Sequence, residues 1–290
     1  MSQPETKKAR VISQQPEPLR SEDRREKMLQ AIGLLHDIEK DSVGRESVTW
    51  SIPHNDPIEV ILLSDLHLGS LATDNKIILD LVEYVLSHEN VYVVMLGDEI
   101  EGIKAEYLDT NRTPLDLYSQ IDLLRLICFD PLVAEKRILA MVSGYWGHPG
   151  WTQDASTINI WNTMTAGYDI PILRNGGILK IKFANGHTQS IRVRHNAPGA
   201  SKVDPVSGLR QAELALSEGE RTDGSVSGHI HRMAVAKEKY SGAASRYYIS
   251  SGTAKGSTKG GIYDRYGEKL GGLPLSDPLG QGVVLQPRTR

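Results

Sequence analysis

The pattern of apolar residues first becomes regular at residue 58, where a near-continuous apolar run of strand length begins. This run covers residues 58–64, and a second run covers residues 91–96. Between them, residues 76–86 carry apolar side chains at helical spacing. Continuous apolar runs are typical of strands that are buried on both faces. The pattern therefore predicts a strand, a helix and a second strand that pairs parallel to the first through a right-handed crossover.

The rest of the chain predicts an α/β fold that changes character halfway. A helical region over residues 115–136 leads to a third strand at residues 138–143. In the second half, residues 178–183 and 190–194 alternate apolar and polar side chains around an Asn-Gly pair at 185–186, which is typical of a tight hairpin. We expect an antiparallel hairpin there, with one face exposed to solvent.

The first 25 residues differ from the rest because they are polar, contain three prolines and carry charges of both signs. Such a segment cannot bury enough apolar surface to fold by itself, so we expect a flexible arm. Apolar residues at three- to four-residue steps between Glu26 and Ile38 predict a short amphipathic helix after the arm. We therefore expect two parts: the arm with its helix over residues 1–45, and one globular domain over residues 46–290.

Composition narrows the class of protein. A chain of 290 residues of which 39% are hydrophobic can form a full core, and its apolar runs are too short to span a membrane. The N-terminal residues lack the apolar region of a signal peptide, so we expect a cytoplasmic protein. Cys128, the single cysteine, lies in an apolar stretch that predicts burial, and one cysteine excludes a thiolate-rich zinc site. A net charge of −3 disfavours nucleic-acid binding through bulk charge alone.

Acidic and imidazole side chains follow the predicted strands. Residues two apart in an extended chain project to the same side, and the carboxyl ends of parallel strands lie along one crevice. We therefore expect six side chains to converge although they are far apart in the sequence: Asp65, His67, Asp98, His195, His229 and His231. Taken alone, an Asp-x-His pair can equally be a capping carboxylate beside a surface histidine.

A divalent metal is the physical reason for such a set of side chains. Carboxylate and imidazole without thiolate suit borderline ions such as Mn²⁺, Fe²⁺, Zn²⁺ or Ni²⁺. A carboxylate that lies between two clusters, as we expect for Asp98, can bridge two ions about 3.5–4 Å apart, which is the arrangement of two-metal phosphoryl transfer. The recurrence of these motifs after successive strands favours two metal ions, with Mn²⁺ as the expected species.

In this order the motifs resemble those of the calcineurin-like metallophosphoesterase family, over residues 58–252. The motifs are Asp65-Leu66-His67, Gly97-Asp98, the segment 144–148, His195 and Gly228-His229-Ile230-His231. The resemblance implies a two-sheet mixed β-sandwich flanked by helices, in four α/β/β/α layers. It also implies that one metal is held by Asp65, His67 and His231, that the other is held by His195 and His229, and that Asp98 bridges them.

The segment 144–148 departs from the family pattern Gly-Asn-His. This chain reads Gly144-Tyr145-Trp146-Gly147-His148, so the asparagine that would bind the second metal is absent. Water, a backbone carbonyl or the carboxylate of Asp154 can fill its place. His148 still follows a glycine, and we expect it to protonate the leaving group.

Three further side chains are expected to contact the substrate: Arg232, Tyr145 and Trp146. The arginine would stabilise the phosphoryl oxygens, and the aromatic pair would stack on a base or sugar. The plainer alternatives are a surface ion pair and packing beneath the loop. Glu99 and Glu101 follow Asp98, and their plainest interpretation is solvated charge at the start of a helix.

Metal-dependent hydrolysis of a phosphoester is the function that these motifs favour. Hydroxide shared by the two ions would attack phosphorus while His148 protonates the leaving oxygen. The protein-phosphatase branch of the family carries Gly-Asp-x-x-Asp-Arg-Gly, and residues 97–102 lack that arginine. Its absence favours a phosphodiesterase or nuclease, acting on nucleic acid, a nucleotide or another phosphoester. The alternative is an inactive scaffold or binding protein on the same fold, which the missing asparagine favours.

Overall fold

The structure is a computed structural model of the 290-residue chain. The residues that it describes are 25–26, 28–29, 45–102, 114–143, 150, 152, 159–201, 203–239, 245–255 and 282–287. The chain divides into two units, Met1–Val43 and Gly44–Arg290. In the first unit, residues 25–26 and 28–29 are helical and exposed. The rest of the expected arm, and of the helix predicted over residues 26–38, lies outside the described residues.

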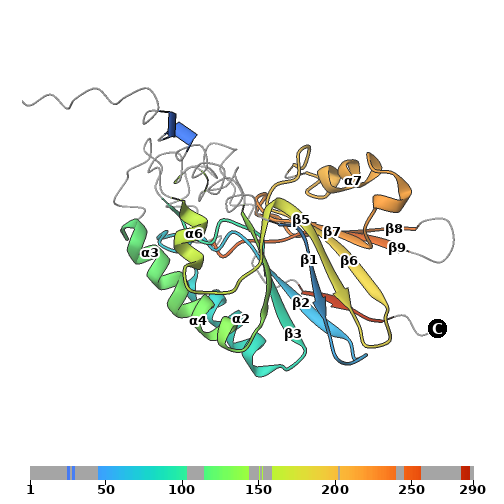
Figure 1. Ribbon diagram of the computed structural model, residues 1–290, viewed down its shortest axis with the longest axis horizontal. Helices are drawn as coiled ribbons and strands as arrows, with labels where there is room; N and C mark the ends of the chain where they lie inside the picture. Colours follow the sequence, from blue (N-terminus) through green and yellow to red (C-terminus); the bar gives the residue numbers. More distant parts are fainter. Residues whose placement is uncertain are drawn as a thin grey trace, which may run out of the picture. The chain divides into compact units, whose positions relative to one another are not determined.

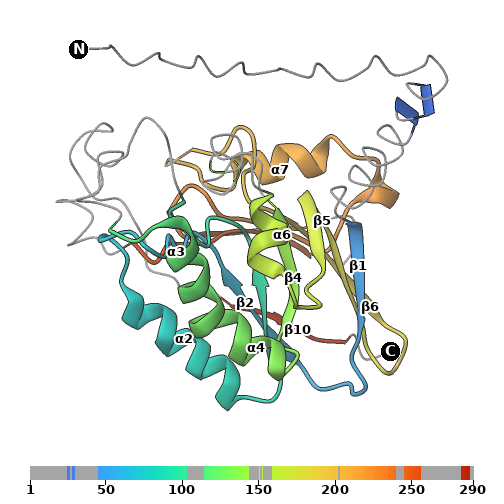
Figure 2. The same cartoon turned by 60° about the vertical axis from the view of Figure 1, so that its left-hand side comes forward.

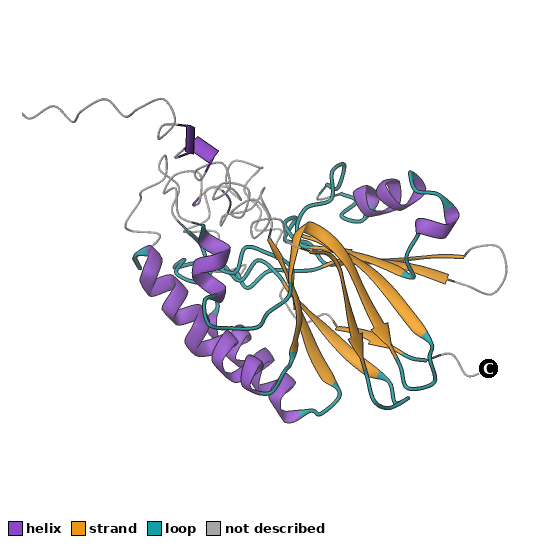
Figure 3. Cartoon of the chain, viewed as in Figure 1, coloured by secondary structure: helices purple, strands orange, loops and turns teal. Residues whose placement is uncertain are grey.

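Among the described residues, ten strands form one sheet in the order β10-β2-β3-β4-β5-β6-β7-β9-β8, and β1 pairs with β5 (Figures 1 and 3). The strands are β1 (Arg45–Ser51), β2 (Ile58–Leu63), β3 (Val91–Met95), β4 (Ile138–Ser143), β5 (Ile172–Lys182), β6 (Thr188–Arg194), β7 (Gly224–Ser227), β8 (Ala234–Lys239), β9 (Ser245–Ser250) and β10 (Gly282–Leu285). The helices are α2 (Asn75–Ser87), α3 (Leu117–Leu124), η2 (Arg125–Phe129), α4 (Asp130–Ala134), α6 (Ile160–Thr165), α7 (Ser207–Leu214) and η3 (Glu218–Glu220).

The first half of the sheet follows from the two apolar runs. β2 pairs parallel with β3 and α2 connects them, so the predicted strand–helix–strand unit is confirmed. Asp74 caps α2 by accepting the backbone N–H of Lys76 at 3.1 Å. The buried side chains of α2, Ile78, Val82 and Val85, belong to the core beneath it. β4 continues the parallel order beside β3, as the third apolar run predicted.

The helical region predicted before β4 is present as α3, the π-helical turn η2 and α4, in direct succession. Asp116 begins α3 by accepting the backbone N–H of Ser119 at 2.9 Å. Cys128 in η2 is buried, as its apolar neighbours predicted. Figures 1 and 2 show α2, α3 and α4 together on one side of the sheet. No helix among the described residues is long and apolar enough to cross a membrane.

The fold is mixed α/β, as expected. The expected sandwich of two separate sheets in four layers is not found, because β5 belongs to both halves of one curled sheet. Its first residues, Ile172–Arg174, pair with β4. Its last residues, Gly177–Lys182, pair antiparallel with β6, which confirms the predicted hairpin. Between these parts, Asn175 and Gly176 have positive φ angles of 49° and 111°. This departure from extended backbone lets the strand change direction without interrupting the sheet.

The curled sheet has a core on each side of its first half. The inner core takes side chains from both halves, and Trp50 of β1 reaches across to donate from Nε1 to the carbonyl of Leu139 in β4 at 2.7 Å. The outer core lies between the first half and the helices α2, α3, α4 and α6. On the second half, Leu209 of α7 packs with Tyr248 of β9. These cores fix the carboxyl ends of β2, β3, β6 and β7, where the candidate ligands lie.

Candidate metal centre

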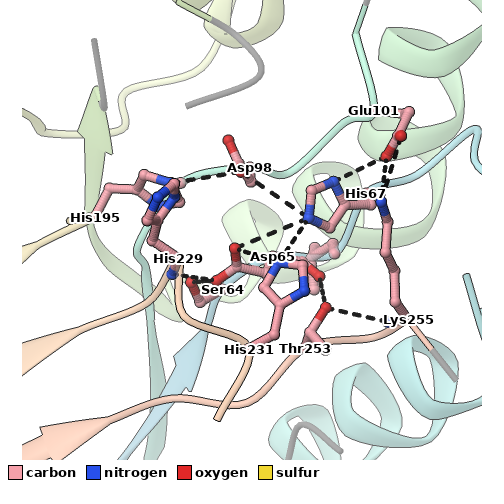
Figure 4. Close-up of polar contacts among 12 residues, drawn as sticks. Ser64, Asp65, His67, Asp98, Glu101, His195, His229, His231, Thr253 and Lys255 are labelled. Carbon is pink, nitrogen blue, oxygen red and sulfur yellow. Dashed lines mark hydrogen bonds and ion pairs between the residues drawn. The ribbon is translucent and has the colours of Figure 1, made fainter. Parts of the chain in front are cut away.

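Six side chains from four strand ends meet at one place in the fold (Figure 4). They form two clusters, in each of which the ligand atoms lie within 4.8 Å of one another: Asp65, His67 and His231 in the first, and Asp98, His195 and His229 in the second. Asp65 and His67 follow β2, and Asp98 follows β3. His195 follows β6, and His229 and His231 follow β7. Both halves of the sheet therefore contribute to each cluster.

The side chains converge by a route that differs from the expected one. An extended chain would project Asp65 and His67 to the same side, but both have a left-handed backbone, with φ of 54° and 50°. Asp98, His229 and His231 share this conformation. Five of the seven described non-glycine residues with positive φ are thus candidate ligands. Such backbones are uncommon and cluster at functional sites. The simple alternation inferred from the sequence is wrong for these loops, although the side chains do meet.

Two glycines let the loops approach each other this closely. A Cβ added to Gly228 would lie 1.7 Å from Ser64 Oγ and 2.6 Å from Asp65 Oδ2. A Cβ added to Gly97, whose φ is 107°, would lie 2.6 Å from His195 Nδ1. Only glycine fits at either position without displacing a candidate ligand.

In the first cluster, ring nitrogens and a carboxylate oxygen face one another. His231 Nε2 lies 3.1 Å from Asp65 Oδ1 and 3.2 Å from His67 Nε2. The other oxygen of Asp65 accepts hydrogen bonds from Ser64 Oγ and, at 2.8 Å, from the backbone N–H of His229. These contacts hold the carboxylate with Oδ1 turned toward the two histidines.

The second cluster adjoins the first through Asp98. The Oδ2 atom of Asp98 lies 3.4 Å from His195 Nε2 and 3.9 Å from His67 Nε2, which belongs to the first cluster. His195 Nε2 in turn lies 3.2 Å from His229 Nδ1. One carboxylate oxygen therefore lies between the two clusters, which is the position that a bridging ligand requires.

In two of the rings, the nitrogen that points away from the clusters lies close to an oxygen atom outside the ligand set. His195 Nδ1 lies 2.9 Å from the backbone carbonyl of Leu96, which can only accept, so this nitrogen carries a proton. His67 Nδ1 lies 2.9 Å from Glu101 Oε2, and a carboxylate at that distance favours a proton on Nδ1. In both rings Nε2 is then the nitrogen turned toward a cluster, which is the orientation that metal-binding histidines require.

The acidic and imidazole side chains of the site shift one another's pKa values. Burial alone would lower the pKa of His195, but the carboxylates of Asp98, Asp65 and Glu99 outweigh it and raise the pKa to about 9. Burial alone would raise the pKa of Asp65, but His231 and His195 hold it below its usual range. Burial, reinforced by Asp98, raises the pKa of Glu99 to about 7. The clusters therefore stabilise positive charge between them.

These features fit a pair of divalent cations. The donors are carboxylates and imidazoles without sulfur, which suits Mn²⁺, Fe²⁺, Zn²⁺ or Ni²⁺. In each cluster the ring nitrogens and carboxylate oxygens lie within 4.8 Å of one another, as the ligand atoms of a bound cation do. The first cluster would hold one ion, His195 and His229 would hold the second, and Asp98 would bind both.

Glu99 and Glu101 are not solvated charges at a helix start. The side chain of Glu99 is fully buried, that of Glu101 is 19% exposed, and residues 98–102 are not helical. Both acids are covered because the loop after β3 pairs with the loop after β2, through a β-bridge between Ile100 and Leu68.

Four residues around the clusters belong to no motif of the sequence: Ser64, Glu101, Thr253 and Lys255. Ser64 donates to the side chain of Asp65, Thr253 donates to its backbone carbonyl at 2.8 Å, and Lys255 pairs with Glu101 at 3.1 Å. Ser64 and Glu101 lie close in sequence to predicted ligands, a signal that could have found them. Thr253 and Lys255 lie far along the chain, and only the fold brings them to the site.

Other predicted site residues have no tested position. Tyr145, Trp146, His148 and Asp154 lie outside the described residues. Arg232 is half-buried directly after His231, and its role in binding a phosphoryl group stays a prediction.

No protein-family model matches the chain, and no curated protein matches its sequence. Solved structures do resemble it. A conserved uncharacterized protein from Streptococcus pneumoniae, described as a predicted phosphoesterase, shares 15% identity at a TM-score of 0.32, over 68% of this chain and 74% of that one. Vps29 from Entamoeba histolytica, solved with Zn²⁺, shares 14% identity at a TM-score of 0.35, over 69% of this chain and 76% of that one. A metallophosphoesterase from Sphaerobacter thermophilus shares 16% identity at a TM-score of 0.31, over 68% of this chain and 77% of that one.

All three neighbours share little sequence identity with this chain and have low TM-scores. At such low identities and TM-scores they carry no weight for function, which has to follow from the two clusters.

Proposed function

We propose that the protein is a metal-dependent phosphoesterase and that its substrate is a phosphodiester, a class that includes nucleic acid and nucleotides. The observation that carries the proposal is the position of Asp98 between two largely buried clusters of carboxylate and imidazole ligands. Two divalent ions, Mn²⁺ above others, would supply a water molecule of lowered pKa and offset the charge on the phosphoryl oxygens.

The chain's own side chains complete this chemistry. His148 protonates the leaving oxygen, Arg232 binds a phosphoryl oxygen, and Tyr145 and Trp146 stack on a base or sugar of the substrate. A diester is favoured over a phosphoprotein because residues 97–102 lack the arginine that marks the protein-phosphatase branch.

The first experiment measures hydrolysis of bis(p-nitrophenyl) phosphate by the metal-free chain with and without added Mn²⁺. We expect turnover that depends on Mn²⁺ and that Asp98→Asn abolishes. Asp80→Asn is the matched control, because Asp80 pairs with Lys76 on the exposed face of α2 and its replacement changes the net charge equally. A native chain that binds two ions but hydrolyses neither this diester nor an oligonucleotide would overturn the proposal.

The role of His148 as the acid calls for a second substrate. A nitrophenolate leaves readily without protonation, whereas an alkoxide does not. We expect His148→Ala to lower the rate by about 10²–10⁴-fold on a diester with an alkyl leaving group, and much less on the nitrophenyl diester. An equal loss on both substrates would show that His148 does not act as the leaving-group acid.

A second candidate function is a scaffold or binding protein that has lost turnover. It is favoured by one observation, the absence of asparagine from the segment 144–148. Metal-stimulated turnover separates the two functions, because a scaffold can bind one ion, or two, without hydrolysing any phosphoester.

A further inference from the structure

Glu101 and Lys255 form a largely covered ion pair against the first cluster. Lys255 Nζ lies 3.1 Å from Glu101 Oε2 and 3.3 Å from Oε1. The two side chains are 19% and 8% exposed for Glu101 and Lys255, respectively. The same Oε2 atom lies 2.9 Å from His67 Nδ1. Figure 4 shows His67 between this ion pair and the other two ligands of the first cluster, Asp65 and His231.

The lysine is anchored to the loop that carries the ligands. Its backbone N–H donates to Thr253 Oγ1 at 3.1 Å, and that hydroxyl donates to the carbonyl of Asp65 at 2.8 Å. Lys255 also forms a β-bridge with Thr73, whose hydroxyl donates to the carbonyl of His67 at 2.6 Å. The segment 253–255 therefore contacts the backbone of Asp65 directly and is linked to His67 through Thr73 and Glu101.

We propose that Glu101 and Lys255 are positioning residues for the first metal ion, an inference that rests on the proposed function. Glu101 keeps a proton on Nδ1 of His67, so that Nε2 turns its lone pair toward the ion. Lys255 engages both oxygens of Glu101, which keeps this carboxylate on the far side of the imidazole. Its charge also balances Glu101, so the acceptor adds little negative charge beside Asp65 and Asp98.

A purely structural ion pair would be different in its effects. Its loss would lower the melting temperature and weaken both ions together, or neither. Positioning through His67 is selective, because His67 belongs to the first cluster, and removing the pair should weaken one ion only.

The experiment titrates Mn²⁺ into the full-length native protein and into Glu101→Ala, Glu101→Gln and Lys255→Met, and measures binding by isothermal titration calorimetry. We expect two ions on the native chain. In Glu101→Ala one of them should bind about 10–100-fold more weakly while the other changes little. Glutamine keeps an acceptor of the same size without the charge, so Glu101→Gln should lose less affinity for this ion than Glu101→Ala does. Lys255→Met should also weaken binding of this ion, and Asp80→Asn should change the affinity of neither ion.

The tautomer of His67 provides a readout that does not depend on metal. In ¹⁵N-histidine spectra of the metal-free protein, the signal lost in His67→Gln identifies this ring. We expect its Nδ1 to be protonated in the native chain, and a mixture of tautomers in Glu101→Ala. If the alanine variant fails to fold, Glu101→Gln and Lys255→Met still test the assignment.

The outcomes separate the two proposals. If the native chain binds two ions, and Glu101→Ala binds both with native affinity and keeps the native tautomer, the positioning role is wrong and the metal centre stands. If the native chain binds no metal, the proposed function fails, and with it the role of the pair toward an ion.

Discussion

A left-handed backbone at a residue with a Cβ costs on the order of 1–3 kcal/mol, and the hydrogen bonds around Asp65 and His67 offset that cost. The N–H of Asp65 donates to the carbonyl of Gly97 at 2.9 Å, and the N–H of His67 donates to the carbonyl of Asp98 at 2.9 Å. The carbonyl of Asp65 accepts from Thr253. Asp65 and His67 are therefore held by hydrogen bonds with neighbouring loops.

Asp98→Ala should remove both ions, because its carboxylate is the ligand that lies between the clusters. We expect elemental analysis of desalted, Mn²⁺-loaded protein to find two ions per native chain and none in the variant. Asp80→Ala removes an exposed carboxylate and should keep both ions. Two ions per chain in Asp98→Ala would show that this residue does not bridge.

Gly228→Ala should damage the first cluster, because the added methyl group would overlap Ser64 Oγ and Asp65 Oδ2. We expect a loss of about 1–3 kcal/mol in the free energy of unfolding, or more, together with weaker binding of one ion. Gly219→Ala is the matched control, since a Cβ there meets nothing within 4 Å. Unfolding in urea and titration with Mn²⁺ measure both effects, and equal stability of the two variants would contradict the prediction.

The ligand types and their order along the chain could be read from the sequence, and the backbone that presents them could not. Asp65 and His231 each follow a strand, which a pattern of apolar runs can locate. Their positive φ angles and their allocation to one cluster depend on loops that meet only in the folded chain. Lys255 shows the limit most clearly, because its partner Glu101 is more than a hundred and fifty positions away.

At the scale of elements, β5 decides how the sheet is built. Its pairing with β4 at one end and with β6 at the other joins the half that carries Asp98 to the half that carries His195. The sequence predicted the hairpin, because its alternation and its Asn-Gly turn are local signals. It could not predict the first part of β5, or β1, β8, β9 and β10, since short or partly exposed strands are fixed by their partners more than by their own residues.

Gly176→Ala should destabilise the fold at the bend of β5. Its φ of 111° disfavours a side chain, and a Cβ would lie 2.6 Å from the carbonyl oxygen of Val193. Gly167→Ala has a φ of 87° but no atom within 4 Å, so it isolates the cost of the backbone, about 1–2 kcal/mol. We expect Gly176→Ala to lose about 1–3 kcal/mol more than this control in urea unfolding. Equal losses would mean that the contact with β6 is relaxed easily.

At the scale of the whole molecule, the described strands and ligands all belong to the unit Gly44–Arg290. Removing residues 1–25, or the whole unit Met1–Val43, should therefore leave the fold and both ions in place. We expect the melting temperature of either truncated chain to stay within about 2 °C of the native value. A large fall in the melting temperature would show that the N-terminal residues are part of the core.

Because each cluster takes ligands from both halves of the sheet, binding of ions should stabilise the whole fold. Unfolding separates His231 from Asp65 and His195 from Asp98, so the unfolded chain cannot bind as tightly. When the free Mn²⁺ concentration is a hundred times Kd, one bound ion adds about 2.7 kcal/mol to the free energy of unfolding. For a chain of this size that corresponds to a rise of roughly 5–10 °C in melting temperature. Calorimetry with and without Mn²⁺ measures the rise, and Asp98→Ala should abolish it. An equal rise in that variant would mean that Mn²⁺ stabilises the protein elsewhere, and that the two halves are not linked through these clusters.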